Sequence, residues 1–483
     1  MSISSSTLFR WGSKAILPIV KRRALGFLYE QNIDRKQEEL LKEKFRRISN
    51  TNIGRRLGVT VSSPRDHVPL TSYGFYRSFF ESPREGDFLY PLDDYVKAMT
   101  SGSGGKPKIF LLPKTGLWEN ITKTGLSFMF ICTHDGEKMN FEVGDTIYRN
   151  VPGGSYSSGY LTEIFKKERS GWVNNVPDIN LPYKDKVEYF IKNYREIDIA
   201  YMTVTALLDD IAPRIDEPLN LKGFVTQDRS ASVLKDKIRD FIGTYPKATY
   251  GSTETSLSGI ASIEFPGSFI MDWRILYCEF IPENVELNLT LDIIEDPTET
   301  VPLMDVEAGK RYKFIATPFK NDLTRYITTD IFECVSNGDS ILGTDLPVFS
   351  FYARSDKLIS MHNFTRISEE EILNALKDAG VPFVDFTTRV ELESSREYMV
   401  IYLEVSSPMS EDEITSRLNQ ELLKVDKDWR DLTNFMGYTP LKVHLLPKGS
   451  FTRYLSVRQG LPKVERIDMN EERLKELLSY ETY

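Results

Sequence analysis

The stretch Thr100-Ser-Gly-Ser-Gly-Gly-Lys-Pro-Lys108 has the composition of a loop that wraps a phosphate group. Its three glycines let the backbone approach an anion closely and turn N–H groups inward. The hydroxyl groups of Thr100, Ser101 and Ser103 add hydrogen-bond donors, and two lysines add positive charge. The Walker spacing G-x-x-x-x-G-K-[ST] cannot be laid over the stretch. The loop therefore suggests a nucleotide site, and a plain surface turn of similar composition stays the alternative.

The overall composition is that of a globular protein of several domains. A length of 483 residues favours about two to four domains, and 41% apolar with 27% charged residues is ordinary for a soluble protein. The net charge of −9 argues against a nucleic-acid partner, which would favour a basic surplus. Three cysteines and four histidines lie scattered, so no disulfide framework, zinc spacing or His-based triad is indicated. A reducing, cytoplasmic location is expected.

The beginning of the chain is basic and contains no acidic residue before Glu30. We interpret it as an amphipathic helix docked on the body, with Leu17, Ile19 and Val20 facing inward. An organelle-targeting segment or a membrane-surface helix is the alternative. No run of about 18 uncharged apolar residues occurs, so a membrane-spanning helix is not expected.

The middle of the chain mixes short apolar runs with helical stretches, which favours an α/β body with buried sheets. Before it, Leu40, Leu41, Phe45 and Ile48 share one face of a helix predicted over 35–48. Further predicted helices cover 184–193 and 231–241, and predicted strands cover 109–112, 197–203, 223–226 and 248–250. Strands predicted over 273–281 and 311–317 indicate a β-rich subdomain.

The C-terminal part has the texture of a compact α+β module of about 120 residues. Ser368 with Glu371 forms a capping-box pattern, and Ser410 with Glu413 forms another. Strands are predicted over 397–405 and 441–445, and Gly380 is expected to end the first helix. We therefore expect a large N-terminal α/β domain over 1–354, containing β-sheets and the β-rich subdomain, and a small mobile α+β domain over 355–483.

Thr249-Tyr-Gly-Ser-Thr-Glu254 follows a predicted strand directly. The end of a strand next to a tight turn is where open α/β sheets place ligands. Tyr250 offers a flat face for a purine, Thr253 a hydroxyl group, and Glu254 an oxygen ligand for Mg²⁺. Taken alone, the segment is better explained as a plain turn with a solvated glutamate.

Three later segments add polar groups of the same kind. Asp330 ends the stretch Arg325-Tyr-Ile-Thr-Thr-Asp330 and can accept hydrogen bonds from both hydroxyl groups of a ribose. Arg354 begins Arg354-Ser-Asp-Lys357 at the expected domain boundary, where a hinge absorbs backbone rotation. Lys463 follows a Gly-Leu-Pro turn and can neutralise charge on a transferring phosphoryl group. The alternatives are that Asp330 is an ordinary surface acid, that Arg354 belongs to a polar linker and that Lys463 is a solvated lysine.

Together these segments resemble the motifs of the adenylate-forming superfamily of firefly luciferase and acyl-coenzyme A synthetases, in their order and rough spacing. More narrowly, the chain is similar to the acyl acid–amido synthetase branch known from auxin- and jasmonate-conjugating plant proteins. The stretches that carry the narrower resemblance are Thr100–Pro113, Tyr277-Cys-Glu-Phe-Ile-Pro282, Phe351-Tyr-Ala-Arg354, Lys448-Gly-Ser-Phe451, Gln459-Gly-Leu-Pro-Lys463 and, more weakly, Asn52–Gly58.

The resemblance implies an ATP-dependent ligase of two steps. A small carboxylic acid attacks the α-phosphate of Mg²⁺-bound ATP, and the acyl group of the acyl-adenylate then passes to the amine of an amino acid. The implied catalytic residues are Lys463, Glu254 and Thr253, with Glu254 as the metal ligand. The implied nucleotide-binding residues are Thr100, Ser101, Gly102, Ser103, Lys108, Tyr250, Gly251, Ser252, Asp330 and Arg354. Phe128, Phe130, Tyr156 and Tyr160 are candidates for the acid pocket.

The chain departs from the family pattern in several places. The loop has one hydroxyl group fewer, and Ile327 and Thr329 replace the usual Arg and Gly before Asp330. His362-Asn-Phe364 stands where many ligases carry a Gly-Glu-Lys segment associated with the second half-reaction, which leaves the acceptor open. Coenzyme A, as in ligases of the phenylacetate type, is the close alternative. A non-catalytic protein that binds a small acid or nucleotide is the alternative of a different class, and Lys448 is available in place of Lys463.

Overall fold

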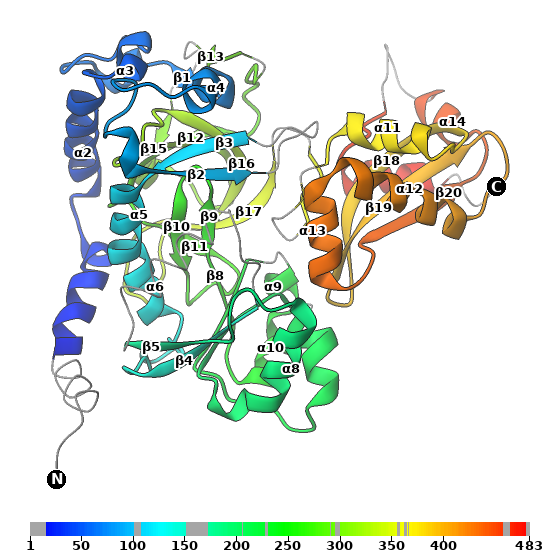
Figure 1. Cartoon of the computed structure of the whole chain (residues 1–483), viewed down its shortest axis with the longest axis horizontal. Helices are drawn as coiled ribbons and strands as arrows, with labels where there is room; N and C mark the ends of the chain where they lie inside the picture. The colour runs from blue at the N-terminus through cyan, green and yellow to red at the C-terminus, as the bar shows by residue number, and fades with distance from the viewer. Residues whose placement is uncertain are drawn as a thin grey trace.

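The computed structural model of the chain shows a large body and a smaller C-terminal body (Figure 1). The structure describes residues 16–100, 108–150, 172–204, 206–227, 230–289, 291–294, 300–354, 358–361, 365, 367–456 and 464–479. Within these residues no helix combines the length and the apolar character that crossing a membrane requires. The fold is mixed α/β with several separate sheets, as expected from the sequence.

The centre of the large body is a mainly antiparallel sheet of ten described strands in the order β14-β12-β15-β16-β17-β11-β10-β9, with β1 beside β16 and β13 beside β1. The strands expected after residue 273 therefore continue the same sheet as β9–β11. The strands are β1 (Leu70–Thr71), β9 (Tyr250–Ser252), β10 (Ser256–Ala261), β11 (Phe269–Met271), β12 (Leu276–Pro282), β13 (Ile293–Ile294), β14 (Val301–Pro302), β15 (Arg311–Pro318), β16 (Tyr326–Ser336) and β17 (Val348–Arg354).

A second sheet of five described strands lies below the first in Figure 1 and is parallel throughout, in the order β5-β4-β6-β7-β8. Its strands are β4 (Asp145–Arg149), β5 (Val173–Val176), β6 (Ile199–Tyr201), β7 (Gly223–Thr226) and β8 (Pro246–Ala248), and its helices are α8 (Tyr183–Asn193), α9 (Ser230–Val233) and α10 (Lys235–Ile242). The helix expected over 231–241 is thus divided into two. At Thr249 the chain leaves β8 and enters β9, so this one residue joins the two sheets.

The N-terminal helices and a β-hairpin cover the large sheet (Figure 1). The hairpin consists of β2 (Tyr95–Thr100) and β3 (Lys108–Pro113), whose ends Thr100 and Lys108 are paired. The helices are α2 (Ile33–Ile48), α3 (Asn52–Arg56), α4 (Tyr73–Glu81), α5 (Lys114–Asn120) and α6 (Leu126–Ile131), the last two joined by the π-helical turn η4 (Ile121–Gly125). Short helical turns complete the body: η1 (Gly26–Tyr29), η2 (Arg65–His67), η3 (Leu92–Asp94), η5 (Tyr194–Glu196), η6 (Ala206–Ile211), η7 (Ala212–Arg214) and η8 (Leu303–Asp305).

The smaller body is a three-stranded sheet, β18-β19-β20, covered by helices. Ser368 and Glu371 form the predicted capping box, with both reciprocal hydrogen bonds present. Ser410 caps its helix by accepting a hydrogen bond from the backbone N–H of Glu413. The elements are α11 (Glu369–Asp378), β18 (Phe383–Glu393), β19 (Arg396–Val405), α12 (Glu411–Val425), α13 (Lys427–Met436), β20 (Leu441–Leu446), α14 (Ser450–Ser456) and α15 (Glu471–Ser479). In this body the sequence analysis missed β18, α13, α14 and α15.

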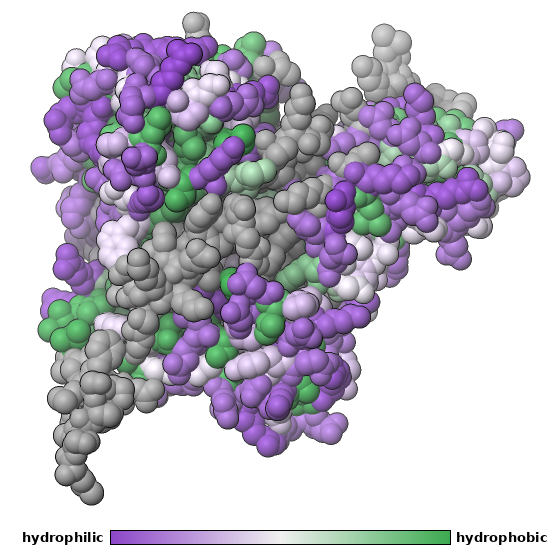
Figure 2. Space-filling model, viewed as in Figure 1, coloured by the Kyte–Doolittle hydropathy of each residue, from purple (hydrophilic) through white to green (hydrophobic). Residues whose placement is uncertain are grey.

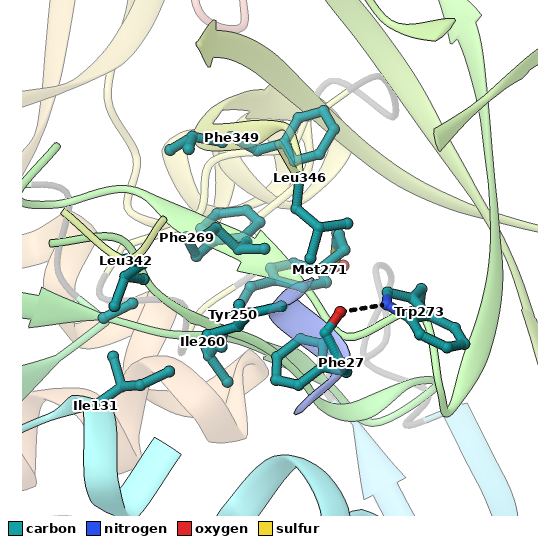
Figure 3. Packing of buried hydrophobic residues seen from close by; sticks show 14 of the residues in the cluster. Phe27, Ile131, Tyr250, Ile260, Phe269, Met271, Trp273, Leu342, Leu346 and Phe349 are labelled. Atoms are coloured by element: carbon teal, nitrogen blue, oxygen red, sulfur yellow. Dashed lines mark hydrogen bonds between the residues drawn. The ribbon is translucent and has the colours of Figure 1, made fainter. Parts of the chain in front are cut away.

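A group of aromatic rings lies within the otherwise mainly aliphatic core of the large body. Tyr250, Phe269, Phe332 and Phe349 belong to one buried cluster, and Figure 3 shows how three of them and their neighbours pack. The indole N–H of Trp273 donates a hydrogen bond of 3.1 Å to the carbonyl oxygen of Phe27, which ties the N-terminal segment to this core. Residues 16–32, the described part of the chain before α2, are therefore packed into the large body.

The first described helical segment, residues 16–25, corrects one expectation. Leu17 and Val20 pack against the core, and Ala24 and Leu25 are buried. Ile19, which we expected to face inward, has 70% of its surface exposed. Residues 17, 20 and 24 repeat at helical spacing, and residue 19 lies on the other side of the helix. The docked helix is confirmed, but its inward face does not include Ile19.

A buried ion pair fixes the beginning of β16. Arg325 and Glu279 both have fully buried side chains, and they form two hydrogen bonds, of 3.0 Å (Nη2 to Oε1) and 3.2 Å (Nε to Oε2). The guanidinium group also donates to the carbonyl oxygen of Val68 at 2.6 Å. Breaking such a pair leaves a buried charge without compensation, at a cost of about 3–5 kcal/mol.

We therefore expect Glu279→Gln to lower the free energy of unfolding by about 3 kcal/mol or more, because Arg325 keeps its charge in a dry site. Urea unfolding followed by tryptophan fluorescence measures the loss, since Trp273 lies in the large-body core. The matched control is Glu333→Gln, which disrupts a half-exposed pair with Arg311 on the same sheet and costs less than about 1 kcal/mol. Equal losses in the two variants would contradict a special role for the buried pair.

Candidate functional site

Three of the predicted site residues meet although they are far apart in the sequence. Tyr250 begins β9, Asp330 lies in β16, and Arg354 is the cross-strand partner of Asp330 at the end of β17. The Tyr250 hydroxyl group donates a hydrogen bond of 2.7 Å to a carboxylate oxygen of Asp330. The side chain of Arg354 is not among those that the structure describes. The sheet therefore places a tyrosine, an aspartate and an arginine position side by side.

The ring of Tyr250 has a packing role. It stacks on Phe269 with centroids 5.2 Å apart and meets the edge of Phe332 at 4.8 Å, and only 7% of the residue is exposed. We had expected its flat face to be offered to a purine. In this structure the ring belongs to the core, and the hydroxyl group is the part that contributes to the site. Because a buried tyrosine hydroxyl group needs a partner, its bond to Asp330 holds the carboxylate in one orientation.

The backbone just before Asp330 is strained. Thr329 has φ of +70° and Arg325 has φ of +43°, the left-handed region that residues with a Cβ rarely adopt. Thr329 is β-branched, which makes this conformation especially unfavourable. This is the position where the resembling family usually has glycine, so the structure gives a physical reason for that preference. The strain lies directly beside the Asp330–Arg354 pair.

Glu254 lines a small cavity on another side of the β9–β10 turn. The cavity has a volume of about 30 Å³, and its wall includes Asn120, the end of β3 and Lys320. Glu254 is 4% exposed and Asn120 is 3% exposed. Among the described residues, Oε2 of Glu254 and Oδ1 of Asn120 have no hydrogen-bond partner. The Asn120 amide nitrogen donates to the carbonyl oxygen of Leu257, which fixes the other end of the amide as the oxygen.

These two oxygens bear on whether the residues fit Mg²⁺. Carboxylate and amide oxygens are suitable ligands, and Mg²⁺ often takes only one or two protein carboxylates and completes its shell with water and phosphate oxygens. No group of three or more His, Cys, Asp or Glu residues that would hold a metal occurs in the described part of the chain. Glu254 and Asn120 therefore fit a cation whose coordination shell is completed by water and a bound phosphate, and they do not form a complete metal site by themselves.

The loop after β15, whose residues Lys320 and Asn321 line the Glu254 cavity, is held in place by buried charged side chains. The ammonium group of Lys44 on α2 donates a hydrogen bond to the backbone carbonyl oxygen of Asn321. The side-chain amide of Asn321 in turn donates a hydrogen bond of 3.2 Å to the backbone carbonyl oxygen of Glu254. Asp322 accepts hydrogen bonds of 2.7 Å from the Tyr95 hydroxyl group and from the Leu89 backbone. Burial lowers the pKa of the Lys44 ammonium group to about 7 and raises the pKa of Asp322. These contacts connect the hairpin and α2 to the β9–β10 turn.

The β9–β10 turn itself is compact. Ser252 accepts a hydrogen bond of 3.2 Å from the backbone of Thr255, and their hydroxyl groups lie 3.0 Å apart. A Cβ at Gly251 would stand 2.8 Å from the carbonyl oxygen of Ser256, so only glycine fits there without a shift. Thr253 lies at the tip of this turn. The predicted motif thus forms a tight hairpin whose first residue reaches Asp330.

The phosphate-loop residues Ser101, Gly102 and Ser103 lie outside the described residues, and only the backbone of Thr100 is described. Lys108 is described, and its ammonium group lies 5.4 Å from the ring centroid of Tyr73 on α4. Lys108 and Pro113 are the two ends of β3, about 17 Å apart at the usual rise of a strand. Because Pro113 walls the Glu254 cavity, the described residues do not bring Lys108 next to Glu254.

The remaining predicted residues are distributed as follows. Lys463 lies outside the described residues, as do Tyr156, Tyr160 and His362-Asn-Phe364. The alternative lysine, Lys448, is exposed just after β20. Phe130 is buried with its ring against Phe141, and Phe128 packs against the same core.

A contact between the two bodies was not foreseen from the sequence. Arg396, at the start of β19, donates to Asp209 at 2.8 Å and lies 3.9 Å from Asp210. The ring of Phe435 on α13 meets the edge of Tyr183 at 5.1 Å. No local pattern marks these residues, because each is an ordinary polar or aromatic residue until the two bodies meet. The contact joins the smaller body to the part of the large body that carries the parallel sheet.

Comparison with known proteins agrees with this architecture. Residues 269–354 match the GH3 family central domain, and residues 369–463 match the GH3 family C-terminal domain. The chain is thus similar to the GH3 family over these two stretches. The first stretch contains β11–β17 with Asp330 and Arg354, and the second contains α11–α14. The resemblance inferred from the sequence is confirmed.

Curated relatives of the chain include plant synthetases. Jasmonoyl–L-amino acid synthetase GH3.5 of Oryza sativa subsp. japonica is 26% identical over 238 residues, which cover 45% of this chain and 39% of that protein. Indole-3-acetic acid-amido synthetase GH3.3 of Arabidopsis thaliana is 25% identical over 194 residues, which cover 37% and 30%. The chain thus matches well under half of the length of these relatives.

Solved structures share the fold over nearly the whole chain. An AtGH3.15 acyl acid amido synthetase in complex with 2,4-DB superposes with a TM-score of 0.50 at 17% identity, and covers 100% of this chain and 97% of that one. A 2-hydroxyisobutyryl-CoA ligase in complex with 2-HIB-AMP and CoA superposes with a TM-score of 0.62 at 15% identity, and covers 92% of each chain. The chain therefore shares its fold with an acyl acid amido synthetase and with a CoA ligase.

The strain at Thr329 leads to a prediction. Thr329→Gly removes the Cβ from a left-handed backbone position, which relieves roughly 1 kcal/mol, so the melting temperature should rise by about 2–4 °C. Differential scanning calorimetry measures the shift. Thr328→Gly is the control, because Thr328 is buried and donates to the carbonyl oxygen of Phe314 at 2.9 Å. That variant should be less stable, and a loss of stability in both variants would contradict the assignment of strain to Thr329.

Proposed function

We propose that the protein activates a small carboxylic acid with ATP and transfers the acyl group to the amine of an amino acid. The observation that carries this proposal is the meeting of Tyr250, Asp330 and Arg354 on one sheet, in a chain that is similar to the GH3 family over two stretches. The relatives' names, which are those of acid–amino acid synthetases, support the reaction class.

In the proposed first step a carboxylate oxygen attacks the α-phosphorus of ATP, and pyrophosphate leaves. In the second step the amine nitrogen attacks the acyl carbon, AMP leaves, and the nitrogen loses a proton. Asp330 has the chemistry to accept hydrogen bonds from the ribose hydroxyl groups, and Tyr250 orients it. Arg354 is proposed to bind the ribose or the α-phosphate beside it.

The polyphosphate and the metal have separate proposed contacts. Residues 100–108 are proposed to surround the β- and γ-phosphates with backbone N–H groups, hydroxyl groups and Lys108. Glu254 is proposed to ligate Mg²⁺, which would neutralise phosphate charge, with Gly251, Ser252 and Thr253 forming the turn that presents it. The buried oxygens of Glu254 and Asn120 that lack a partner support a cation near this turn.

The two bodies are proposed to act as the adenylating domain, residues 1–354, and a mobile domain, residues 355–483. Each body has its own hydrophobic cluster, which supports the division. The charged contact of Arg396 with Asp209 and Asp210 is partly exposed and can be exchanged for water at low cost, as movement of the smaller body requires. Lys463 is the proposed cation delivered by the mobile domain.

A coenzyme A thiol in place of the amine is the second candidate for the acceptor. The shared fold with the 2-hydroxyisobutyryl-CoA ligase, at the higher of the two TM-scores, favours keeping it. The first step is identical in the two reactions, so the acceptor has to be tested separately.

The decisive experiment measures AMP and pyrophosphate formation from Mg²⁺-bound ATP with a panel of carboxylic acids, followed by mass spectrometry of products with amino acids or coenzyme A. We expect acid-dependent AMP formation that Glu254→Ala nearly abolishes, while Glu307→Ala, an exposed surface change, leaves it unchanged. Normal activity of Glu254→Ala would remove Glu254 from the mechanism. Absence of AMP formation with every acid would favour a non-catalytic binding protein.

The two candidate lysines can be separated directly. If Lys463 neutralises charge in the transition state of adenylation, Lys463→Ala lowers the rate of acid-dependent ATP–pyrophosphate exchange by about 100-fold or more. Lys448→Ala, the matched control, should leave the exchange rate within about twofold. The reverse pattern would assign the role to Lys448, and unchanged exchange in both variants would contradict a lysine from this body.

A further inference from the structure

A large polar cleft lies beside Lys108, and none of the predicted roles accounts for it. Its volume is about 700 Å³, and it opens between α4, the loop before α4 and the start of β16. Its charged lining consists of Arg56, Arg77, Lys108, Glu81 and Asp292. In Figure 2 hydrophilic residues cover much of the end of the molecule that carries α3 and α4.

Two arginines of this cleft are held by aromatic rings. The guanidinium carbon of Arg56 lies 5.4 Å from the ring centroid of Phe75 and 5.7 Å from that of Phe79, and that of Arg77 lies 5.6 Å from Tyr73. Contact with a ring face restrains a guanidinium group while its N–H donors, which lie in its plane, stay available. The arginines are therefore held ready to bind an acceptor.

Arg56 and Arg77 have no ion-pair partner in the described part of the chain. Glu81 and Asp292 line the same cleft without forming an ion pair with either arginine there. The charged groups of both Arg77 and Lys108 lie near the ring of Tyr73. The three cations and two carboxylates leave a net positive charge, and the mutual repulsion of the cations would be relieved by a bound anion.

The cleft adjoins the proposed nucleotide site on two sides. Lys108 begins β3 directly after the phosphate-loop segment, and Thr329, which also lines the cleft, precedes Asp330. An anion in the cleft would therefore lie beside Lys108 and next to the strand that carries Asp330. The anion that the proposed first step releases is pyrophosphate, whose several oxygens suit the forked donors of arginine.

We propose that this cleft binds pyrophosphate, with Arg56 and Arg77 as its ligands beside Lys108. The site receives the leaving group when the carboxylate oxygen displaces it from the α-phosphorus, and no further bond is made or broken. This inference rests on the proposed function, because the identity of the anion follows from the proposed reaction. The site shares Lys108 with the proposed phosphate loop and adds two ligands, Arg56 and Arg77, that the sequence motifs do not contain.

Calorimetric titration of the full chain with Mg²⁺ and sodium pyrophosphate, without ATP or acid, tests the proposal. Arg56→Gln and Arg77→Gln should each weaken binding about tenfold or more, as expected for the loss of a charge-assisted hydrogen bond. Arg55→Gln is the matched control, because Arg55 is exposed on the same short helix, donates to Asn52 at 2.6 Å and does not line the cleft. It should stay within about twofold of the unmodified chain.

Unchanged pyrophosphate affinity in the double variant, or no binding by the unmodified chain, would overturn the proposal. Binding of aspartate in its place, lost in Arg77→Gln, would also overturn it, in favour of a site for the amino acid carboxylate. If Arg77→Gln does not fold, Arg56→Gln still decides, since its side chain is exposed. If the chain forms AMP in the presence of an acid but the variants bind pyrophosphate as tightly as the unmodified chain, only the proposed pyrophosphate site is refuted. Loss of binding in the variants with no AMP formation refutes only the proposed reaction.

Discussion

The buried pair of Arg325 and Glu279 is the constraint on which the site depends. Both charges are removed from water, and such a pair is tolerated only when its geometry satisfies the charges fully. Here Glu279 also accepts a hydrogen bond of 2.8 Å from Thr300, and Arg325 donates to the carbonyl oxygen of Val68. Because β16 begins at the next residue, the pair fixes where this strand starts, and Asp330 follows at a set distance along it.

The sheet then holds this strand in a conformation that its sequence does not favour. Left-handed backbone at Arg325 and Thr329 is compatible with folding because the flanking strands and the buried pair allow no other path. The pairing of β16 with β17 is irregular just after Asp330, between Ile331 and Phe332. Strain and irregularity thus surround the carboxylate that meets Tyr250, as is common where a fold positions a functional group.

The aromatic core supplies the rigidity behind the site, and charged contacts supply the adjustable parts. Tyr250 is held by Phe269 and Phe332, so its hydroxyl group has little freedom. By contrast, the smaller body meets the large one through Arg396 and Asp209, a partly exposed pair. Packed rings resist displacement, whereas exposed ion pairs exchange with water cheaply. The proposed movement of the smaller body would break the exposed ion pair and leave the packed rings in place.

The sequence by itself determined the elements whose signals are local. The apolar face of α2, the strand β7 and the capping box of α11 were predicted from spacing and capping residues. The family resemblance named Tyr250, Asp330 and Arg354 as parts of one nucleotide site. The structure places them side by side, and their binding roles stay predictions. Periodicity and caps act within a few residues, so a single chain displays them.

The contacts between residues that are distant in the sequence could be identified only from the folded structure. The pairing of Arg325 with Glu279 joins residues 46 positions apart, and that of Arg396 with Asp209 joins residues 187 apart. The exposure of Ile19, the burial of the Tyr250 ring and the division of α9 from α10 likewise depend on what packs against each segment. The sequence specifies the charge and shape of each side chain. Its burial and its contacts, which determine how much it contributes to stability, depend on which distant segments pack against it.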